Sequence, residues 1–349
     1  MDEVPESREP RREASERLVA RLTESDDPVL AYKARILTGL SPDSDEARTL
    51  QARIADSPMA RTLLRVLDQD AKTLQHTYRK WQGPHWTLVF LALIDYPPGD
   101  ETLRPLVNRV HDWLFSKHFL APPSTAVYAG QENRVRHCAS QDGNAIWYSV
   151  KLGLDDERTR QVVDRLVGWQ WPDGGWNCDK RREVAASSFQ ESLVPARGLV
   201  AFGRRHGYEP ALRAADRVAD LMLPRRLLWR QRDGVMISPH WGGRPDRIHF
   251  PNQFLDVLFA LQVMVDLKRI GDARCTDALA LLESKRLADG GFPLEQPDAR
   301  TSARIVSRGT YATWGPAGSR RSNPLVSLAV LAVIQAAEVT HAAGSRRDP

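Results

Sequence analysis

Two kinds of helical segment alternate along this chain, and the alternation restricts its fold more than any other feature. One kind is apolar on nearly all sides, as in 86–94 and 325–334. A helix without a polar face has to be buried all round. The other kind is amphipathic, as in 156–170, where apolar residues share one face and charged residues the other. Such a helix covers a core on one side and meets water on the other.

The order of the two kinds predicts the architecture. Apolar helices are expected at 86–95, 144–153, 188–203, 252–268 and 324–339, and amphipathic helices at 101–116, 156–170, 210–223 and 272–286. Helices at 33–45, 48–56 and 59–75 are expected to precede them. A repeat in which every second helix is buried implies two concentric layers. We therefore predict an all-α fold, an α/α toroid; an open solenoid, which would leave its concave helices partly polar, ranks second.

The toroid is expected to form one domain over residues 28–341. A charged, partly mobile arm at 1–27 and a disordered tail at 342–349 are expected to flank it. The connections between helix pairs also repeat: Trp169-Gln-Trp-Pro-Asp-Gly-Gly-Trp176 resembles Ser284-Lys-Arg-Leu-Ala-Asp-Gly-Gly-Phe292. Asp-Gly is a turn signal, because Asp caps its own turn and Gly accepts a positive φ. We expect Gly174, Gly175, Gly290 and Gly291 at outer-to-inner connections, with a positive φ at one glycine of each pair.

Charge and cysteine content restrict the partners and the compartment. The net charge is +5, but basic residues are interleaved with acidic ones, and RNA-binding or zinc-finger spacings are absent, so no specific nucleic-acid partner is expected. Three scattered cysteines do not make a disulfide scaffold and suit a reducing cytoplasm. The N-terminus has no apolar core of a secretory signal. The longest apolar run, 325–337, is shorter than a bilayer crossing requires.

The paired-aromatic and Asp-Gly-Gly-aromatic turns at 169–178 and 284–292 resemble the repeat of two families. These are the squalene–hopene and other class II terpenoid cyclases, and the β-subunits of protein prenyltransferases. As architecture the resemblance covers roughly residues 85–340, and it implies an α/α barrel with a central cavity at the N-terminal ends of the inner helices. The sequence lacks the Asp-x-Asp-Asp motif of the cyclases and the Asp-x-Cys zinc pair of the prenyltransferases. Acid–base work would therefore fall to other residues.

Three residues are the candidate catalytic groups. Asp256 is expected one turn inside an apolar helix, where an unpaired carboxylate is costly and needs a partner, such as His249, or a task. Glu191 begins another apolar helix; it is either a capping-box acid with Ser188 or a general acid or base whose pKa burial raises. His85 lies at a helix N-terminus, where the dipole favours neutral imidazole; it either caps the helix or acts as a base.

The candidate substrate-binding residues lie at the same level of the expected ring. They are Asn144, Asn252, Trp241, Trp314 and His249. Aromatic walls stabilise cations or stack on sugars, but they also simply pack. Cys178, Asp179, His240 and His249 carry metal-ligand atoms, yet no pair has a dedicated ligand spacing, so neither a metal nor another cofactor is expected.

The resemblance implies an enzyme acting on a hydrophobic, isoprenoid-type small molecule by acid–base chemistry in the central cavity. Such a substrate would also be consistent with contact with a membrane surface. Two alternatives stay open: a saccharide-acting α/α-barrel lyase or hydrolase with facing carboxylates, and a binding protein that keeps the cavity without catalysis. The oligomeric state is not indicated.

Overall fold

The computed structural model describes residues 9–67, 76–237, 244–251, 256–297 and 299–344. This part of the chain is mostly helical, as predicted, and each of its strands is two residues long. The strands form two parallel pairs: β1 (His249–Phe250) with β2 (Gln296–Pro297), and β3 (Arg300–Thr301) with β4 (Gly309–Thr310).

Apolar helices form near all five predicted positions. They are α5 (Pro84–Leu93), α8 (Ala139–Lys151), α10 (Phe189–His206), α12 (Val257–Asp266) and α14 (Pro324–Gly344). In α5 every residue from Pro84 to Ala92 is buried, which accounts for the missing polar face. The prediction of burial is wrong at the end of the predicted range, because Glu338 and Val339 are exposed, Val339 by 64%.

Amphipathic helices follow the apolar ones as expected. They are α6 (Arg104–Leu114), α9 (Glu157–Trp169), α11 (Glu209–Met222) and α13 (Thr276–Glu283). Three single 3-10 turns flank these helices: η2 (Glu101–Leu103) before α6, η3 (Leu223–Arg225) after α11 and η4 (Ala273–Cys275) before α13. Helix α9 buries Val162, Val163 and Leu166 and begins with a capping box at Asp156. The earlier helices are α2 (Pro28–Leu37), α3 (Asp45–Ile54) and α4 (Pro58–Leu64), and α7 (Lys117–Leu120) is a single turn.

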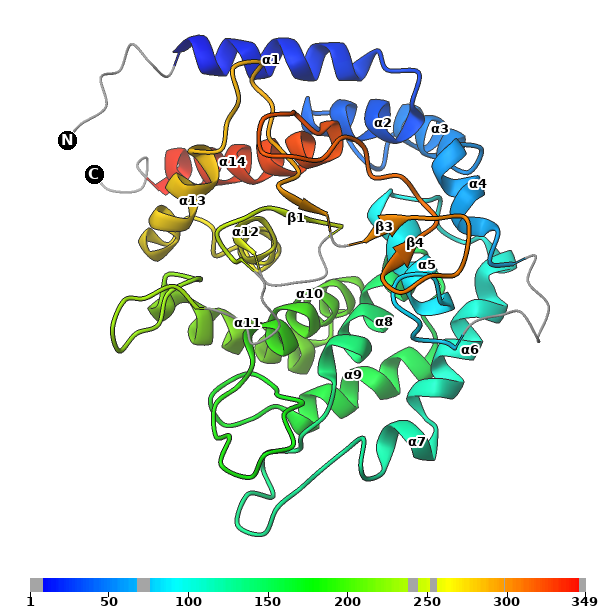
Figure 1. Cartoon of the computed structure of the whole chain (residues 1–349), viewed down its shortest axis with the longest axis vertical. Coiled ribbons are helices and arrows are strands. Elements are labelled where there is room, and N and C mark those ends of the chain that lie inside the picture. Colours follow the sequence, from blue (N-terminus) through cyan, green and yellow to red (C-terminus); the bar gives the residue numbers. More distant parts are fainter. Residues whose placement is uncertain (1–8, 68–75, 238–243, 252–255, 298, 345–349) are drawn as a thin grey trace.

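The apolar helices contact one another in chain order (Figure 1). Helix α5 packs on α8, α8 on α10, α10 on α12 and α12 on α14, while α14 also reaches α2. The amphipathic helices cover them: α6 packs on α5 and α8, α9 and α11 on α10, and α13 on α12. Helices α8 and α10 approach most closely at two glycines, since a Cβ on Gly198 would lie 2.3 Å from the carbonyl oxygen of Gly143.

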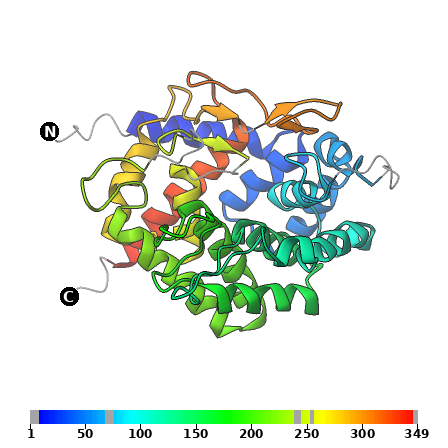
Figure 2. The same ribbon diagram turned by 60° about the horizontal axis from the view of Figure 1, so that its bottom comes forward.

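Residues 9–23, assigned from the sequence to a charged, partly mobile arm, form helix α1 (Glu9–Thr23). Its buried residues Leu18, Val19 and Leu22 cluster with Ala34 of α2 and Leu328 of α14. Figure 2 shows α1 beside α14, although the two stand at opposite ends of the chain. The sequence interpretation therefore missed an ordered element that joins the N-terminal and C-terminal helices.

The two Asp-Gly-Gly turns have the same hydrogen bonds. The amide of Trp171 donates to the carbonyl of Gly175, as the amide of Leu287 does to Gly291. The amide after each glycine pair donates to a serine of the next apolar helix, Trp176 to Ser192 and Phe292 to Ser327. Gly174 and Gly290 have φ of +99° and +81°, which confirms the predicted positive φ in each pair.

The two turns also face equivalent neighbours. A Cβ on Gly174 would lie 2.7 Å from the carbonyl oxygen of Arg217, on the amphipathic helix α11 that follows. A Cβ on Gly290 would lie 2.3 Å from the backbone of Ala14 and Ser15, on α1. Helix α1 therefore packs on the second turn as α11 packs on the first.

Helix α14 is longer than the sequence interpretation expected. Residues Pro324–Ala342 are long and apolar enough to cross a membrane by length and composition alone, and an 18-residue stretch within them is 39% buried. Core helices of soluble proteins have the same length and composition, and α14 packs on α2 and α12.

Candidate functional site

Glu191 lies in the first turn of α10 and is buried. Ser188 caps α10, as expected, but the Glu191 side chain does not return to the cap. Instead its two carboxylate oxygens accept from the backbone N–H of Ser140, at 2.7 Å, and from the Ser140 hydroxyl, at 3.0 Å. Burial raises the pKa of Glu191, although the two bonds from Ser140 act in the opposite direction. The carboxylate is thus held between α8 and α10.

Two cysteine thiols lie beside this carboxylate. The Sγ atoms of Cys138 and Cys178 and an oxygen of Glu191 are all within 4.8 Å of one another. Hydrogen bonding with Cys138, burial and the charge of Glu191 all raise the pKa of the Cys178 thiol. The sequence interpretation grouped Cys178 with Asp179, His240 and His249, and so it missed this group. Cys138 directly precedes α8 and Glu191 lies in the first turn of α10, but Cys178 lies in the connection before α10, so the sequence carried no signal that joins all three.

Tyr78 and His85 connect the carboxylate to an aromatic region. Burial raises the pKa of Tyr78 well above its usual range, with Glu191 and the two thiols adding to the shift. The Tyr78 ring lies 5.3 Å from His85, which also contacts Trp86 and Tyr148 edge-on. The Nε2 atom of His85 is buried and has no hydrogen-bond partner among the described residues. Glu191 and His85, predicted to share a site, thus both interact with Tyr78, Glu191 through its charge and His85 through a ring contact.

Burial lowers the pKa of His85 to about 3, with Asp142 opposing the shift. Above the ordinary histidine pKa the ring is neutral in both folded and unfolded chains. Below it, the unfolded chain binds a proton that the folded chain rejects, so stability falls as the pH drops toward 3.

Between about pH 7.5 and about pH 5, we expect the free energy of unfolding of His85→Phe to fall by about 2 kcal/mol less than that of the wild type, because the variant has no imidazole to protonate. Denaturant unfolding at each pH measures the difference. His341→Phe, at an exposed position, is the control; equal pH profiles for His85→Phe and wild type would contradict the prediction.

Asn144 is buried one turn after Ser140 on α8. Its Oδ1 accepts from the guanidinium of Arg197 at 3.0 Å. The same guanidinium lies 3.8 Å from the centre of the Trp147 ring and 4.9 Å from that of Phe259. Burial lowers the pKa of Arg197 to about 10. Arg197 was not predicted, because an arginine inside an apolar helix resembles a surface residue in the sequence.

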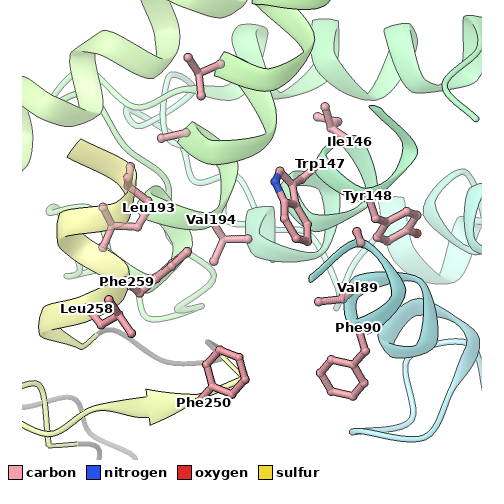
Figure 3. Packing of buried hydrophobic residues seen from close by; sticks show 14 of the residues in the cluster. Val89, Phe90, Ile146, Trp147, Tyr148, Leu193, Val194, Phe250, Leu258 and Phe259 are labelled. Atoms are coloured by element: carbon pink, nitrogen blue, oxygen red, sulfur yellow. The ribbon is translucent and has the colours of Figure 1, made fainter. Parts of the chain in front are cut away.

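Trp314 belongs to the aromatic wall of the same interior. It is buried and packs edge-on against Phe90 of α5 and Phe250 of β1, with ring centres 5.0 and 5.4 Å away. Phe90 in turn contacts Trp86, the neighbour of His85. Figure 3 shows Phe90, Phe250 and apolar side chains of α8, α10 and α12 around one apolar region. Trp314 and His85 therefore belong to one aromatic cluster.

The structure corrects the position of Asp256. Helix α12 begins at Val257, so Asp256 is its N-cap rather than a residue one turn inside. The carboxylate, fully buried, accepts from the backbone N–H groups of Phe259 and His249, both at 2.6 Å. These bonds explain why a carboxylate is buried there. The predicted residues Trp241 and Asn252, and also His240, lie outside the described residues.

Asp142 lies in the first turn of α8. It pairs with Arg165 at 2.5 Å and with His137 Nε2 at 2.6 Å. Burial opposes its ionisation, but these two partners outweigh burial and keep the pKa of Asp142 below its usual value. Each oxygen of the Asp142 carboxylate therefore has a partner within the fold.

Two surface hollows of about 410 Å³ each lie elsewhere. One is lined by Leu212, Arg213, Asp216 and Arg217 of α11, and the other by residues of α6 with Val66 and Leu67. Neither includes a predicted site residue.

Comparisons with protein-family models, with curated proteins and with solved structures find no match for this chain.

Proposed function

We propose that this chain is an α/α toroid and an enzyme acting on an apolar, isoprenoid-type small molecule by acid–base chemistry in its interior. The proposal rests mainly on the position of Glu191. Its buried carboxylate is oriented by Ser140, and its charge acts on Tyr78, whose ring contacts His85 and Trp86.

Two features support the toroid. The apolar helices α5, α8, α10, α12 and α14 contact one another in sequence, and α14 reaches α2. Helix α1 packs on the Gly290 turn as α11 packs on the Gly174 turn. Helix α1 thus takes the position of the outer helix that would follow the Gly290 turn. A closed ring of repeats requires such a contact between its first and last elements.

The chemistry follows from the surroundings of Glu191. A carboxyl group held in an apolar interior can pass a proton to or from a bound substrate without competition from bulk water. The Tyr78 ring contacts His85 and Trp86. These rings would contact the hydrocarbon part of the substrate. Aromatic faces also stabilise developing positive charge. Because Asp142 is bound to Arg165 and His137, a single carboxyl is favoured over the facing pair that a saccharide-acting enzyme would use.

We expect Glu191→Gln to lower turnover at least about 100-fold while leaving substrate binding in place, since the amide keeps the shape but cannot exchange the proton. Farnesol, geranylgeraniol and squalene are suitable probes, with binding followed by tryptophan fluorescence and products by mass spectrometry. Glu183→Gln, at an exposed position, is the matched control. Saturable binding of none of the three probes, or equal turnover in the two variants, would contradict the proposal.

A further inference from the structure

The group formed by Cys138, Cys178 and Glu191 has the composition of a metal site. Two thiols and a carboxylate converge within 4.8 Å from three separate segments of the chain. We propose that these three side chains bind one divalent cation of the zinc type. The proposal shares Glu191 with the catalytic one but concerns binding: in the cation-bound protein the carboxylate is a ligand, and proton transfer by Glu191 belongs to the cation-free protein.

The backbone fixes the two thiols relative to each other. The amide of His137, next to Cys138, donates to the carbonyl of Asn177, next to Cys178, at 2.9 Å. The Asn177 side chain is tied in turn to Ala186, through Nδ2. The thiols therefore stand on two paired segments, so binding a cation would not require these segments to be brought together.

The carboxylate is oriented from outside the group. Ser140 donates its backbone N–H to one oxygen of Glu191 and its hydroxyl to the other. A carboxylate oxygen accepts more than one bond, so each keeps a lone pair for a cation. Groups that bond metal ligands in this way orient them and strengthen binding. Ser140 is thus a positioning residue for Glu191.

The charge around the group is compatible with a bound cation. Two thiolates and a carboxylate carry three negative charges, which a divalent cation does not fully neutralise. The ammonium of Lys180, bonded to the carbonyls of Ser124 and Arg136, lies close enough to interact with all three donors. It offsets the remaining charge. Both cysteines are only half-buried, which leaves the cation a route of entry.

The donor set favours zinc. Thiolates select soft or borderline cations over Mg²⁺ and Ca²⁺, and tetrahedral zinc binds sulfur at about 2.3 Å. Neighbouring ligands then stand about 3.8 Å apart, so the donors need to move inward by at most about 1 Å. Three protein ligands leave a fourth position for water or substrate. None of the three donors belongs to an Asp-x-Cys pair, so this group differs from the zinc pattern of the prenyltransferases.

The test uses Co²⁺ as a spectroscopic probe on the reduced full-length chain. We expect a thiolate-to-cobalt charge-transfer band that saturates at one equivalent and disappears when Zn²⁺ is added. Cys138→Ser and Cys178→Ser should each weaken binding at least 10-fold and reduce the band. Cys275→Ser is the matched control, because Cys275 is buried beside Arg269 and away from the group. It should bind like wild type.

Ser140 provides a second readout. Ser140→Ala should weaken Co²⁺ binding about 10- to 100-fold, and Ser140→Thr, which keeps the hydroxyl, should restore it. Absence of the charge-transfer band in the wild type, or equal loss in Cys275→Ser, would overturn the proposal. A Cys138–Cys178 disulfide formed in air, with no cobalt bound after reduction, would also overturn it. These readouts need no substrate, so their failure is distinct from failure of the turnover experiment.

Discussion

Gly290→Ala is expected to lower the free energy of unfolding by about 3 kcal/mol. Two costs add. Gly290 has a φ of +81°, where an alanine side chain is strained. The new Cβ would also lie 2.3 Å from the backbone of Ala14 and Ser15, and a backbone cannot move aside as a flexible side chain can. Helix α1 would have to shift, and its bonds to this turn would be lost. Denaturant unfolding of the variant measures the sum.

Gly39→Ala separates the two costs. Gly39 has a φ of +103°, but a Cβ there would meet nothing within 4 Å. The free energy of unfolding of this variant should fall only by the cost of placing an alanine at a positive φ, about 1 kcal/mol. Equal losses in the two variants would mean that α1 does not pack on the Gly290 turn in solution.

Asp256→Ala should lower the free energy of unfolding by a similar amount, about 3 kcal/mol. The variant loses the N-cap of α12 and leaves the buried N–H of His249 without its carboxylate acceptor. Loss of a cap alone costs about 1 kcal/mol, and a buried unsatisfied donor adds about 1–3 kcal/mol. Thermal and denaturant unfolding measure the change.

Asp156→Ala is the control for capping without burial. Asp156 caps α9 but is only half-buried, so this variant should lose about 1 kcal/mol. If Asp256→Ala instead unfolds like wild type and loses turnover, Asp256 belongs to the catalytic machinery, as its setting in the sequence first suggested.

Helix positions were predictable because each depends on a local pattern. The apolar runs gave α5, α8 and α10 to within about five residues, a normal margin for helix ends. Helix α12 begins later than expected, with Asp256 as its N-cap; the predicted residues 252–255 lie outside the described part of the chain. Helix α1 was missed because its apolar residues are few and its partner Leu328 lies at the other end of the chain.

The candidate site was predictable only in part. Glu191 and His85 could be selected because polar residues at the start of apolar helices are conspicuous. The contacts of these residues could not be predicted from the sequence. Ser140 and Glu191 are 51 residues apart and meet only because α8 and α10 approach each other at Gly143 and Gly198. Cysteine spacing carried no signal, because the ligands of a site formed by tertiary contacts need no fixed separation in sequence.

The contact between α1 and the Gly290 turn has a consequence for synthesis of the protein. The Ser15 hydroxyl donates to the carbonyl of Gly290, 275 residues later, and the guanidinium of Arg286 donates to the same Ser15 oxygen. On the ribosome, α1 emerges before its docking turn, which is synthesised 275 residues after Ser15. Leu18, Val19 and Leu22 also lack Leu328, the α14 part of their cover, until α14 has been made. During that interval the nascent chain exposes apolar residues of α1, the kind of surface that promotes aggregation and that chaperones protect.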